Sequence, residues 1–343
     1  MEACMRFHRV LLLGAAAAMG LSLTPGTAAA VERDVATNLV VPWDIAFLPD
    51  RSALVTERNS ARVLSISNGT TREVARIPGV SAQGEGGLLG IAVSPNYATD
   101  RYVFVYYTST SDNRIARFRI GETPAPIVTS IPRGQSIHNG GGLSFGPDGL
   151  LYAGTGDAGN TANAQNPSSL GGKVLRMTMD GRPAPGNPTS SLVYSLGHRN
   201  VQGLAWDAQG RMYAAELGQN RLDELNRIQP GGNYGWPTCE GACNNPRFVD
   251  PLLTWSTATA SPSGLAFHQG NLYMAALRGQ RLWKIPVNAN GGVGQPQALF
   301  SGTYGRLRAV ASAPDGTLWF STSNRDGRGS PLAGDDRIVS TTS

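Results

Sequence analysis

The chain has 343 residues, of which 41% are hydrophobic and 15% charged, with a formal net charge of +5. Its basic residues are scattered rather than clustered, so we expect no nucleic-acid partner, because nucleic-acid binding needs a basic patch or stripe. The 43 glycines and 22 prolines favour a fold with many tight turns. No charge block or Ser-rich linker divides the chain, so the sequence predicts a single domain over residues 31–343.

Residues 1–30 are typical of a secretory signal peptide. Arg6 and Arg9 form the charged start, residues 10–19 the apolar core, and residues 28–30 are three alanines that suit cleavage. The apolar run is too short and too rich in Ala and Gly to be a strong membrane-spanning helix. We therefore expect cleavage after Ala30 and an exported product, periplasmic or extracellular, with no membrane span.

Short strand pairs closed by Gly-containing turns recur about six times along the chain. The expected strands are residues 43–48, 90–93 with 102–107, 141–145 with 150–154, 203–206 with 212–215, 264–267 with 272–276, and 308–313 with 318–322. A repeat of roughly 45–60 residues made of strands and tight turns is typical of a β-propeller. The sequence therefore predicts an all-β protein, a six-bladed β-propeller with four-stranded antiparallel blades.

Loop residues from five of these blades are expected to meet at one end of the propeller channel. The hairpin turn reverses the chain, so residues before the first strand and after the second strand of a pair lie on the same face. These residues are Glu85, His138 with Asn139, Asp157, Arg199 with Asn200, Gly218 with Gln219, Arg278, and Arg306 with Arg308. Loops on a rigid scaffold are where binding and catalysis concentrate.

Among the three histidines that follow the signal peptide, His138 is the candidate for catalysis. It stands in a Gly-rich segment, where backbone and ligand can approach closely, and Asp157 is expected on the same face. A carboxylate beside an imidazole orients the ring and stabilises its protonated form, which makes a competent general base. We expect His198 to pack or hydrogen-bond locally, and His268 to lie at the surface on the far face.

The arginines at the predicted mouth indicate an anionic ligand. Arg199 adjoins Asn200, and Arg306 and Arg308 share one side of a strand, since alternate strand residues face the same way. Arginine forks bind carboxylates bidentately, so several of them at one mouth imply a ligand with several negative charges. The alternative is that each arginine forms a salt bridge with a neighbouring loop.

Two further features concern metal ions and cysteines. The loops around residues 216–226 and 231–237 are rich in carboxylates and carbonyls, which suits calcium, although their spacing is not that of an EF-hand. Cys239 and Cys243 are close in sequence, and export permits a disulfide between them. Two cysteines without nearby third and fourth ligands do not indicate zinc.

Several segments resemble the soluble quinoprotein glucose/sorbosone dehydrogenases, and most of all the periplasmic aldose sugar dehydrogenases of that family. The matching segments are residues 84–90, 137–141, 197–200, 223–226, 231–237 and 306–308, in the same order over nearly the whole chain after residue 30. The resemblance implies a six-bladed propeller that binds pyrroloquinoline quinone (PQQ) over the channel, together with calcium. It also implies oxidation of an aldose sugar at its anomeric carbon to a lactone.

The resemblance assigns a role to each matching residue. His138 would be the base that takes the proton from the anomeric hydroxyl as hydride passes to the quinone, and Asp157 would orient it. Arg199 would lie against the quinone and stabilise the charge that grows on its oxygen. The cofactor would also meet Glu85, Asn200, Arg278, Arg306 and Arg308. The backbone carbonyls of Gly218 and Gln219 would bind the cofactor calcium, and Glu224 with the backbone at Tyr234 would bind a second, structural calcium.

Two departures from the family pattern keep alternatives open. Glu85 stands where family members often carry Gln, and a carboxylate beside an anionic cofactor is unfavourable unless it is protonated or paired. Arg278 stands where the glucose enzymes use Lys. One alternative is a metal-dependent hydrolase of the lactonase type, and another is a non-enzymatic binding propeller that has lost its cofactor. The sequence predicts neither the physiological sugar nor the electron acceptor.

Overall fold

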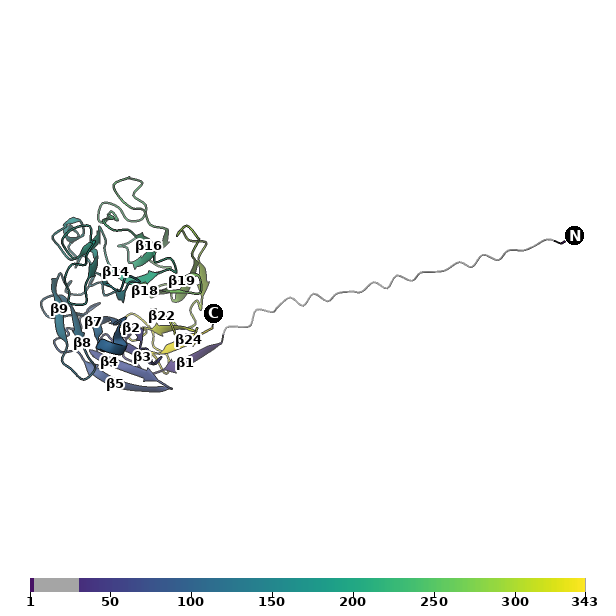
Figure 1. The fold of residues 1–343 in the computed structure, drawn as a ribbon, viewed down its shortest axis with the longest axis horizontal. Coiled ribbons are helices and arrows are strands. Elements are labelled where there is room, and N and C mark those ends of the chain that lie inside the picture. Colours follow the sequence, from purple (N-terminus) through teal and green to yellow (C-terminus); the bar gives the residue numbers. More distant parts are fainter. Residues whose placement is uncertain (3–30, 343) are drawn as a thin grey trace. The chain divides into compact units, whose positions relative to one another are not determined.

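The computed structural model describes residues 1–2 and 31–342, so most of the expected signal peptide lies outside the described residues. Residues 32–341 form six four-stranded antiparallel sheets that surround a central axis (Figure 1). The predicted all-β, six-bladed propeller is therefore confirmed. The connections of the described part include two short helices, α1 (Tyr97–Asp100) and α2 (Ala162–Gln165), and no helix there is long and apolar enough to cross a membrane.

Each blade is one sheet whose first strand lies nearest the axis. Blade 1 contains β2 (Pro42–Phe47), β3 (Ala53–Glu57), β4 (Arg62–Ser67) and β5 (Thr70–Arg76), and blade 2 contains β6 (Leu88–Val93), β7 (Val103–Thr108), β8 (Asn113–Phe118) and β9 (Ala125–Ile131). Blade 3 contains β10 (Leu143–Phe145), β11 (Leu151–Gly154), β12 (Lys173–Met177) and β13 (Val193–Leu196), and blade 4 contains β14 (Val201–Trp206), β15 (Met212–Glu216), β16 (Leu222–Ile228) and β17 (Leu253–Ser256). Blade 5 contains β18 (Pro262–His268), β19 (Asn271–Ala276), β20 (Arg281–Pro286) and β21 (Gln297–Leu299).

The sixth blade combines strands from both ends of the described chain. It contains β22 (Leu307–Ser312), β23 (Leu318–Thr322), β24 (Ile338–Thr341) and, as its outermost strand, β1 (Glu32–Ala36). β1 pairs antiparallel with β24, with Glu32 opposite Thr341. This pairing joins the beginning and the end of the ring, and closure protects edges that would otherwise be open to pairing with other chains.

Apolar side chains pack between neighbouring blades rather than in one central core. Each of the six hydrophobic clusters draws its residues mainly from two adjacent sheets. Between blades 2 and 3, for example, the rings of Phe104 and Phe145 meet edge to face with centroids 5.2 Å apart. Face-to-face sheet packing explains why strands such as β7 are buried along their whole length.

The glycines that recur near the start of the innermost strands allow these strands to approach one another. A Cβ atom at Gly90 would lie 2.2 Å from the carbonyl oxygen of Gly141, and one at Gly203 would lie 2.4 Å from that of Ser263. Both distances are shorter than any real contact, so only glycine fits. The recurring glycine in the sequence is therefore a mark of the crowded axis of the propeller.

Irregular pairing of the innermost strands projects a tier of side chains across the channel. The register between first and second strands shifts at Trp43, Gln202, Ser263 and Arg308, and such bulges re-aim side chains. Arg308 Nη1 lies 3.4 Å from both Gln202 Oε1 and Ser263 Oγ, and its guanidinium carbon lies 5.9 Å from the Trp43 ring centre. Gln202 lines a cavity on each side of this tier.

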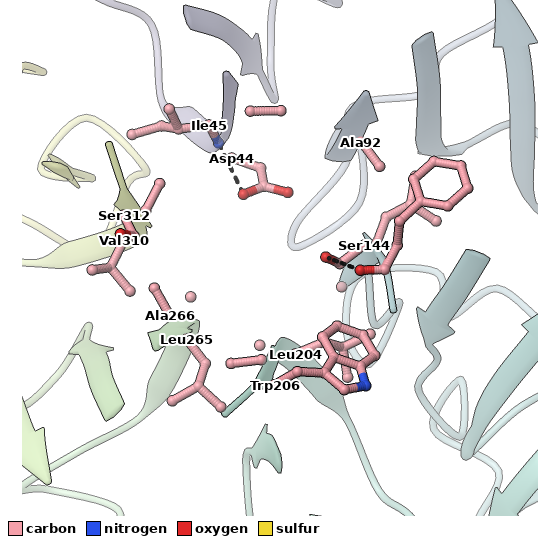
Figure 2. Close-up of a pocket in the computed structure, with 18 of the residues that line it drawn as sticks. Asp44, Ile45, Ala92, Ser144, Leu204, Trp206, Leu265, Ala266, Val310 and Ser312 are labelled. Carbon is pink, nitrogen blue, oxygen red and sulfur yellow. Dashed lines mark hydrogen bonds between the residues drawn. The ribbon is translucent and has the colours of Figure 1, made fainter. Parts of the chain in front are cut away.

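The cavity on one side of the tier, of about 690 Å³, is lined largely by apolar residues of the innermost strands. The Asp44 carboxylate points into it (Figure 2). This carboxylate accepts hydrogen bonds from the backbone N–H groups of Ile45 at 2.9 Å and Ile91 at 3.0 Å, and so ties blade 1 to blade 2. Burial raises the pKa of Asp44 to about 7, although the two backbone hydrogen bonds act in the opposite direction.

The expectation that His268 lies at the surface is wrong. Only 5% of this residue is exposed, and its Nδ1 lies 2.8 Å from Ser312 Oγ in the neighbouring blade. The reason is that β22 packs against β18 and covers the end of the strand that carries His268. A hairpin position read from one repeat alone does not reveal this neighbour.

Candidate active site

A second cavity, of about 660 Å³, lies on the other side of the tier of bulged residues. Its volume is in the range of small-molecule sites. Its lining includes Glu85, His138, Arg199, Asn200, Gly218, Gln219, Arg278, Arg306 and Arg308. The structure therefore brings together residues from loops that are far apart in the sequence, as the expected hairpin topology requires.

His138 and Asp157 form a hydrogen-bonded pair at this cavity. The distance between His138 Nδ1 and Asp157 Oδ1 is 2.6 Å. Asp157 is fully buried, whereas His138 keeps 9% of its surface exposed. With Nδ1 bonded to the carboxylate, Nε2 is the ring nitrogen that remains for a ligand.

The pKa of Asp157 is held below its usual range. Burial alone would raise this pKa, but hydrogen bonds from His138, the Gly159 backbone and the Trp236 indole outweigh it, and the charge of His138 acts in the same direction. The Gly159 N–H donates to Oδ1 at 2.8 Å and the indole N–H of Trp236 to Oδ2 at 2.9 Å. The carboxylate is thus ionised and held at both oxygens.

The backbone around His138 is compressed against neighbouring loops. His138 has a φ of 56°, in the left-handed region that non-glycine residues seldom adopt. Its N–H donates to Glu85 Oε2 at 3.0 Å, and a Cβ at Gly156 would stand 2.0 Å from its carbonyl oxygen. Strained residues of this kind persist where their surroundings over-determine them, and they cluster at functional sites.

Arg199 and Asn200 present unpaired donors among the described residues. Arg199 Nε and Asn200 Nδ2 are both buried without a hydrogen-bond partner. Their other atoms are held: Arg199 Nη1 donates to the Leu217 carbonyl at 3.0 Å, and Asn200 Oδ1 accepts from the Gly140 N–H at 2.9 Å. Buried donors without partners are costly, and a ligand with acceptor atoms would satisfy them.

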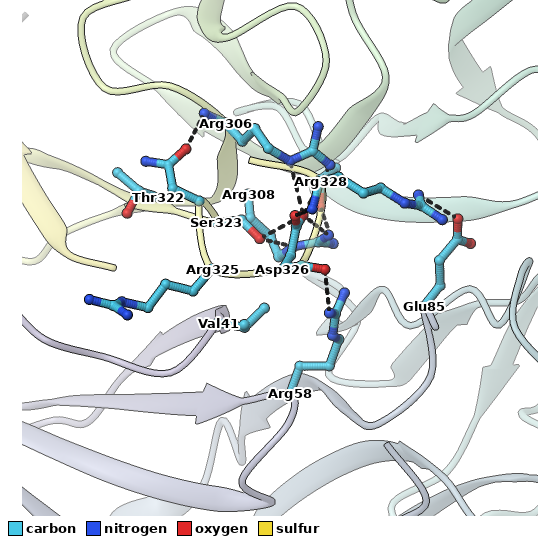
Figure 3. A network of polar contacts seen from close by, with 12 residues as sticks. Val41, Arg58, Glu85, Arg306, Arg308, Thr322, Ser323, Arg325, Asp326 and Arg328 are labelled. Atoms are coloured by element: carbon cyan, nitrogen blue, oxygen red, sulfur yellow. Dashed lines mark hydrogen bonds and ion pairs between the residues drawn. The ribbon is translucent and has the colours of Figure 1, made fainter. Parts of the chain in front are cut away.

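Asp326 lies among the side chains of Arg58, Arg306 and Arg308 (Figure 3). Its Oδ2 is 3.0 Å from Arg306 Nη2 and 3.7 Å from Arg308 Nη2. Arg308 also donates to Ser323 Oγ at 3.1 Å. Burial lowers the pKa of Arg308 to about 9, and the charge of Arg58 contributes to the same shift. One carboxylate does not neutralise three guanidinium groups, so this corner favours a further anion.

The cavity as a whole carries an excess of positive charge. Among the described residues that line it, six are arginines and three carry carboxyl groups, a formal surplus of three positive charges. One of these acids, Asp223, accepts the N–H groups of Gly218 and Ser261, and burial raises its pKa to about 6. Arg278 is exposed at the rim and has no ion-pair partner in the described part of the chain. The lining therefore fits a multiply anionic ligand.

The loop at Gly218 and Gln219 is held by its N–H groups. The Gly218 N–H donates to Asp223 at 2.9 Å, and the Gln219 N–H to Glu240 Oε1 at 2.7 Å. Within the described residues neither carbonyl oxygen of this pair accepts a hydrogen bond. A Cβ at Gly218 would lie 1.8 Å from the Leu222 carbonyl oxygen, so this tight loop requires glycine.

Glu224 and Tyr234 are not among the residues that line the mouth cavity. Glu224 Oε1 accepts the Gly241 N–H at 2.7 Å, and Oε2 accepts Asn226 Nδ2 at 3.0 Å. Burial and the neighbouring Glu216 raise the pKa of Glu224 to about 8. Asn226 Oδ1 is buried without a hydrogen-bond partner. Within the described ranges no three His, Cys, Asp or Glu side chains gather in a way that would hold a metal ion.

The ring of Tyr234 stacks on His198 with centroids 4.5 Å apart. His198 is fully buried and bonds through Nδ1 to Glu216 and through Nε2 to Ser195, both at 2.8 Å. This confirms the expected local role of His198. The predicted disulfide between Cys239 and Cys243 is also formed.

Several residues at the site were not singled out by the sequence. They are Arg58, Gln202, Asp223, Trp236, Asp326 and Arg328. Arg58 and Asp326 follow the second strands of blades 1 and 6, so the rule that places residues after a second strand at the mouth would have found them. Trp236 carries no such signal, because its contact with Asp157 joins residues 79 positions apart.

Comparison with known proteins agrees with these features. The family model described as Glucose / Sorbosone dehydrogenase matches residues 39–332. The PQQ-bound form of aldose sugar dehydrogenase from Streptomyces coelicolor is 51% identical, with a TM-score of 0.87, and the match covers 91% of this chain and 98% of that one. Aldose sugar dehydrogenase YliI of Escherichia coli is 27% identical over 83% of this chain and 88% of its own length. Quinoprotein glucose dehydrogenase B of Acinetobacter calcoaceticus is 30% identical over 60% of this chain and 52% of its own length.

The family match spans most of the chain and includes strands of all six blades, with only β1 and β24 outside it, and it includes every residue discussed above at the mouth. This protein belongs to the glucose/sorbosone dehydrogenase family of oxidoreductases.

Proposed function

We propose that this protein is a PQQ-dependent aldose dehydrogenase that oxidises sugars at the anomeric carbon to lactones. The observation that carries the proposal is the His138–Asp157 pair, 2.6 Å apart, at a cavity with a surplus of positive charge. The similarity to a PQQ-bound aldose sugar dehydrogenase supports the choice of cofactor. When bound, the quinone would accept the hydride that leaves the sugar.

The cavity lining supports residue roles in holding an anionic quinone. Arg306 and Arg308 would meet its carboxylates, because guanidinium forks suit carboxylates and Asp326 neutralises them only in part. Asn200 Nδ2 and Arg199 Nε are buried donors that a ligand acceptor would satisfy. Arg278 would add a charge at the rim, and Glu85 would border the cofactor.

His138 would act as the general base. Its Nδ1 proton is directed to Asp157, so Nε2 would accept the proton from the anomeric hydroxyl. The resulting imidazolium would be stabilised by the buried, ionised Asp157. Arg199 would stabilise negative charge as it develops on the oxygen of the acceptor.

Calcium would bind at two places. The backbone carbonyls of Gly218 and Gln219 accept no hydrogen bond among the described residues, which supports their use as ligands beside the cofactor. Glu224 and the backbone at Tyr234 would hold a second ion. The unpaired Asn226 Oδ1 beside the carboxyl of Glu224 supports a cation there.

The two alternatives have weaker support. A metal-dependent hydrolase would need a cage of carboxylates and amides around its metal ion, whereas six arginines line this cavity and suit an anionic cofactor better. Glu85 keeps open a propeller that has lost its cofactor, because a carboxylate beside an anionic cofactor is unfavourable unless it is protonated or paired. Glu85 is paired with Arg328 at 3.2 Å, which supports cofactor binding over its loss. We further propose that the protein is exported, as the sequence of residues 1–30 indicates.

The experiment that tests the proposal is reconstitution of the purified protein with PQQ and calcium, followed by reduction of an artificial dye with a panel of aldoses. We expect dye reduction that depends on sugar, quinone and calcium, and a lactone as product. Tight quinone binding without dye reduction would instead support the binding propeller. Hydrolysis of lactones without quinone would support the hydrolase.

A further inference from the structure

We propose that Trp236 is a positioning residue for the His138–Asp157 pair. Its indole N–H limits the proton affinity of His138 by donating a hydrogen bond to Oδ2 of Asp157, the oxygen that does not face His138. The proposal deepens the proposed function, because it rests on His138 acting as the base. Trp236 lies in the connection between β16 and β17 of blade 4, outside the strands that repeat around the propeller.

The two oxygens of Asp157 have separate partners. Oδ1 faces His138 Nδ1 at 2.6 Å and the Gly159 N–H at 2.8 Å, whereas Oδ2 accepts the Trp236 indole N–H at 2.9 Å. Asp157 is fully buried. In this setting the indole is the one side chain, among the described residues, that bonds Oδ2. It therefore fixes the rotation of the carboxylate about its Cβ–Cγ bond.

Trp236 is itself held firmly enough to do this. Its backbone N–H donates to the Gly197 carbonyl at 3.0 Å, and its carbonyl accepts Gln165 Nε2 at 2.7 Å. Only 8% of the residue is exposed. The Arg199 guanidinium carbon lies 5.6 Å from the centre of its ring. The Trp236 side chain therefore contacts both Asp157, which pairs with the proposed base, and Arg199, which is proposed to stabilise charge on the quinone.

The disulfide between Cys239 and Cys243 packs against the backbone next to Trp236. A Cβ at Gly235, the residue before Trp236, would lie 2.4 Å from the sulfur atoms of both Cys239 and Cys243. The bridge thus packs directly against the backbone that carries the indole. This packing at Gly235 limits the room in which the adjoining Trp236 backbone can move.

The chemical consequence follows from the hydrogen bond. A donor to Oδ2 draws charge from the carboxylate, and so weakens the attraction of Oδ1 for the imidazolium proton. Without the indole N–H, the carboxylate would be more basic and the His–Asp pair would hold its proton more tightly. His138 and Asp157 share one hydrogen bond, so this expectation concerns the proton affinity of the pair rather than of either residue alone.

The test uses Trp236→Phe, which keeps an aromatic ring and removes the N–H donor. The pKa of His138 is measured by NMR titration of its imidazole in the full chain with calcium and without quinone. We expect the pKa to rise by about half a unit to one unit, as the net value of one hydrogen bond implies. The matched control is Trp283→Phe, which removes an indole hydrogen bond to the Thr259 carbonyl in blade 5 and should leave the titration unchanged.

An unaltered His138 titration in folded Trp236→Phe would overturn the proposal. A second measurement on the wild-type protein needs no variant: the indole N–H resonance of Trp236 should shift with the pH at which His138 titrates, and that of Trp283 should not. If the Trp236 resonance shows no such inflection, the proposal is also wrong.

The quinone-loaded enzyme separates this proposal from the proposed function. In active enzyme, the acid limb of the pH profile of kcat/KM should move to higher pH in Trp236→Phe, by the same shift as the titration. If Trp236→Phe shifts the His138 titration but no sugar supports dye reduction by the quinone-loaded wild type, the dehydrogenase function is wrong and the role of Trp236 stands. If the enzyme is active but Trp236→Phe shifts neither the titration nor the pH profile, the role of Trp236 is wrong and the dehydrogenase function stands.

Discussion

Glu85 and Arg328 form an ion pair of 3.2 Å at the mouth of the propeller, although 243 positions separate them in the sequence. The other oxygen of Glu85 accepts the backbone N–H of His138. The carboxylate that departs from the family pattern is thus paired with a guanidinium (Figure 3). It also supports the backbone of the candidate base.

Replacing Glu85 by Gln should strengthen quinone binding. The amide oxygen preserves an acceptor for the His138 N–H, and the loss of negative charge leaves Arg328 free to attract an anion. We expect at least about threefold tighter binding, in keeping with the modest energy of an exposed ion pair, measured by titrating the calcium-loaded protein with PQQ. Arg328→Ala should have the opposite effect. Weaker binding in Glu85→Gln would show that the carboxylate itself contributes to the cofactor site.

His138→Ala should remove general-base catalysis. The turnover number should fall on the order of 10² to 10⁴-fold, while the affinity for quinone should stay near the wild-type value because we assign cofactor binding mainly to the arginines. Steady-state dye reduction and a separate quinone titration measure the two effects. His268→Ala is the matched control, since His268 lies at the other side of the channel tier and bonds only Ser312 among the described residues. Near-normal turnover of His138→Ala at saturating quinone would refute the assigned role.

Arg308 should contribute more to quinone affinity than Arg278. Its guanidinium is buried and lies 3.7 Å from Asp326, a carboxylate that it shares with Arg306, so a further anion would offset the positive charge at this corner. Arg308→Ala should weaken quinone binding by about tenfold or more, as expected when about one charge-assisted hydrogen bond is lost, whereas the exposed rim substitution Arg278→Ala should weaken it less. Titration of each calcium-loaded variant with PQQ measures the difference, and a wild-type affinity in Arg308→Ala would contradict the assignment.

Glu240 should control the calcium affinity of the mouth loop. Its Oε1 accepts the consecutive N–H groups of residues 219–222, at 2.7 to 3.2 Å, and these bonds outweigh burial to lower its pKa. Glu240→Ala would release the loop whose carbonyls we assign to calcium. The calcium concentration that half-restores dye reduction should rise by about tenfold or more, as expected when about one charge-assisted hydrogen bond or more is lost. Glu122→Ala, on an exposed turn, is the control; an unchanged calcium requirement in Glu240→Ala would remove the loop from the metal site.

Glu224 should make the chelator-treated protein less stable as pH rises. Its folded-state pKa is raised to about 8 from an ordinary value of 4.5, so the folded state binds the extra proton between these values. The free energy of unfolding should then fall with pH across that window, by up to about 1.4 kcal/mol per pH unit. Calcium, which favours the ionised carboxylate, should oppose this loss by binding the folded state.

Thermal melts of Glu224→Gln test this directly. The variant should lose both the fall in melting temperature between pH 5 and about 8 and the part of the calcium-induced gain that comes from the second ion. Asp34→Asn, which alters an exposed carboxylate of β1 paired with Arg337 at 3.0 Å, should leave the calcium response intact. If Glu224→Gln melts like wild type throughout a calcium titration, the second ion is misassigned.

The sequence by itself determined the repeating strand pairs and the face of the propeller on which each loop lies. Strand pairs of similar length with a glycine at the crowded axis predict blades, because a side chain at Gly90 or Gly203 would collide with the neighbouring strand. Once the repeat is known, hairpin geometry places residues such as His138 and Arg199 at one mouth. These inferences succeed because they depend on local rules of strand and turn.

The tertiary structure alone decided which groups pair. The partner of Glu85, the indole donor to Asp157, and the burial of His268 all come from segments in other blades. The joining of β1 to β24 likewise depends on the ring closing on itself. Hydrogen bonds and ion pairs act over a few ångströms. The number of residues between two such partners does not predict how close they lie in space. The charge balance and proton affinities of the site are therefore properties of the folded ring.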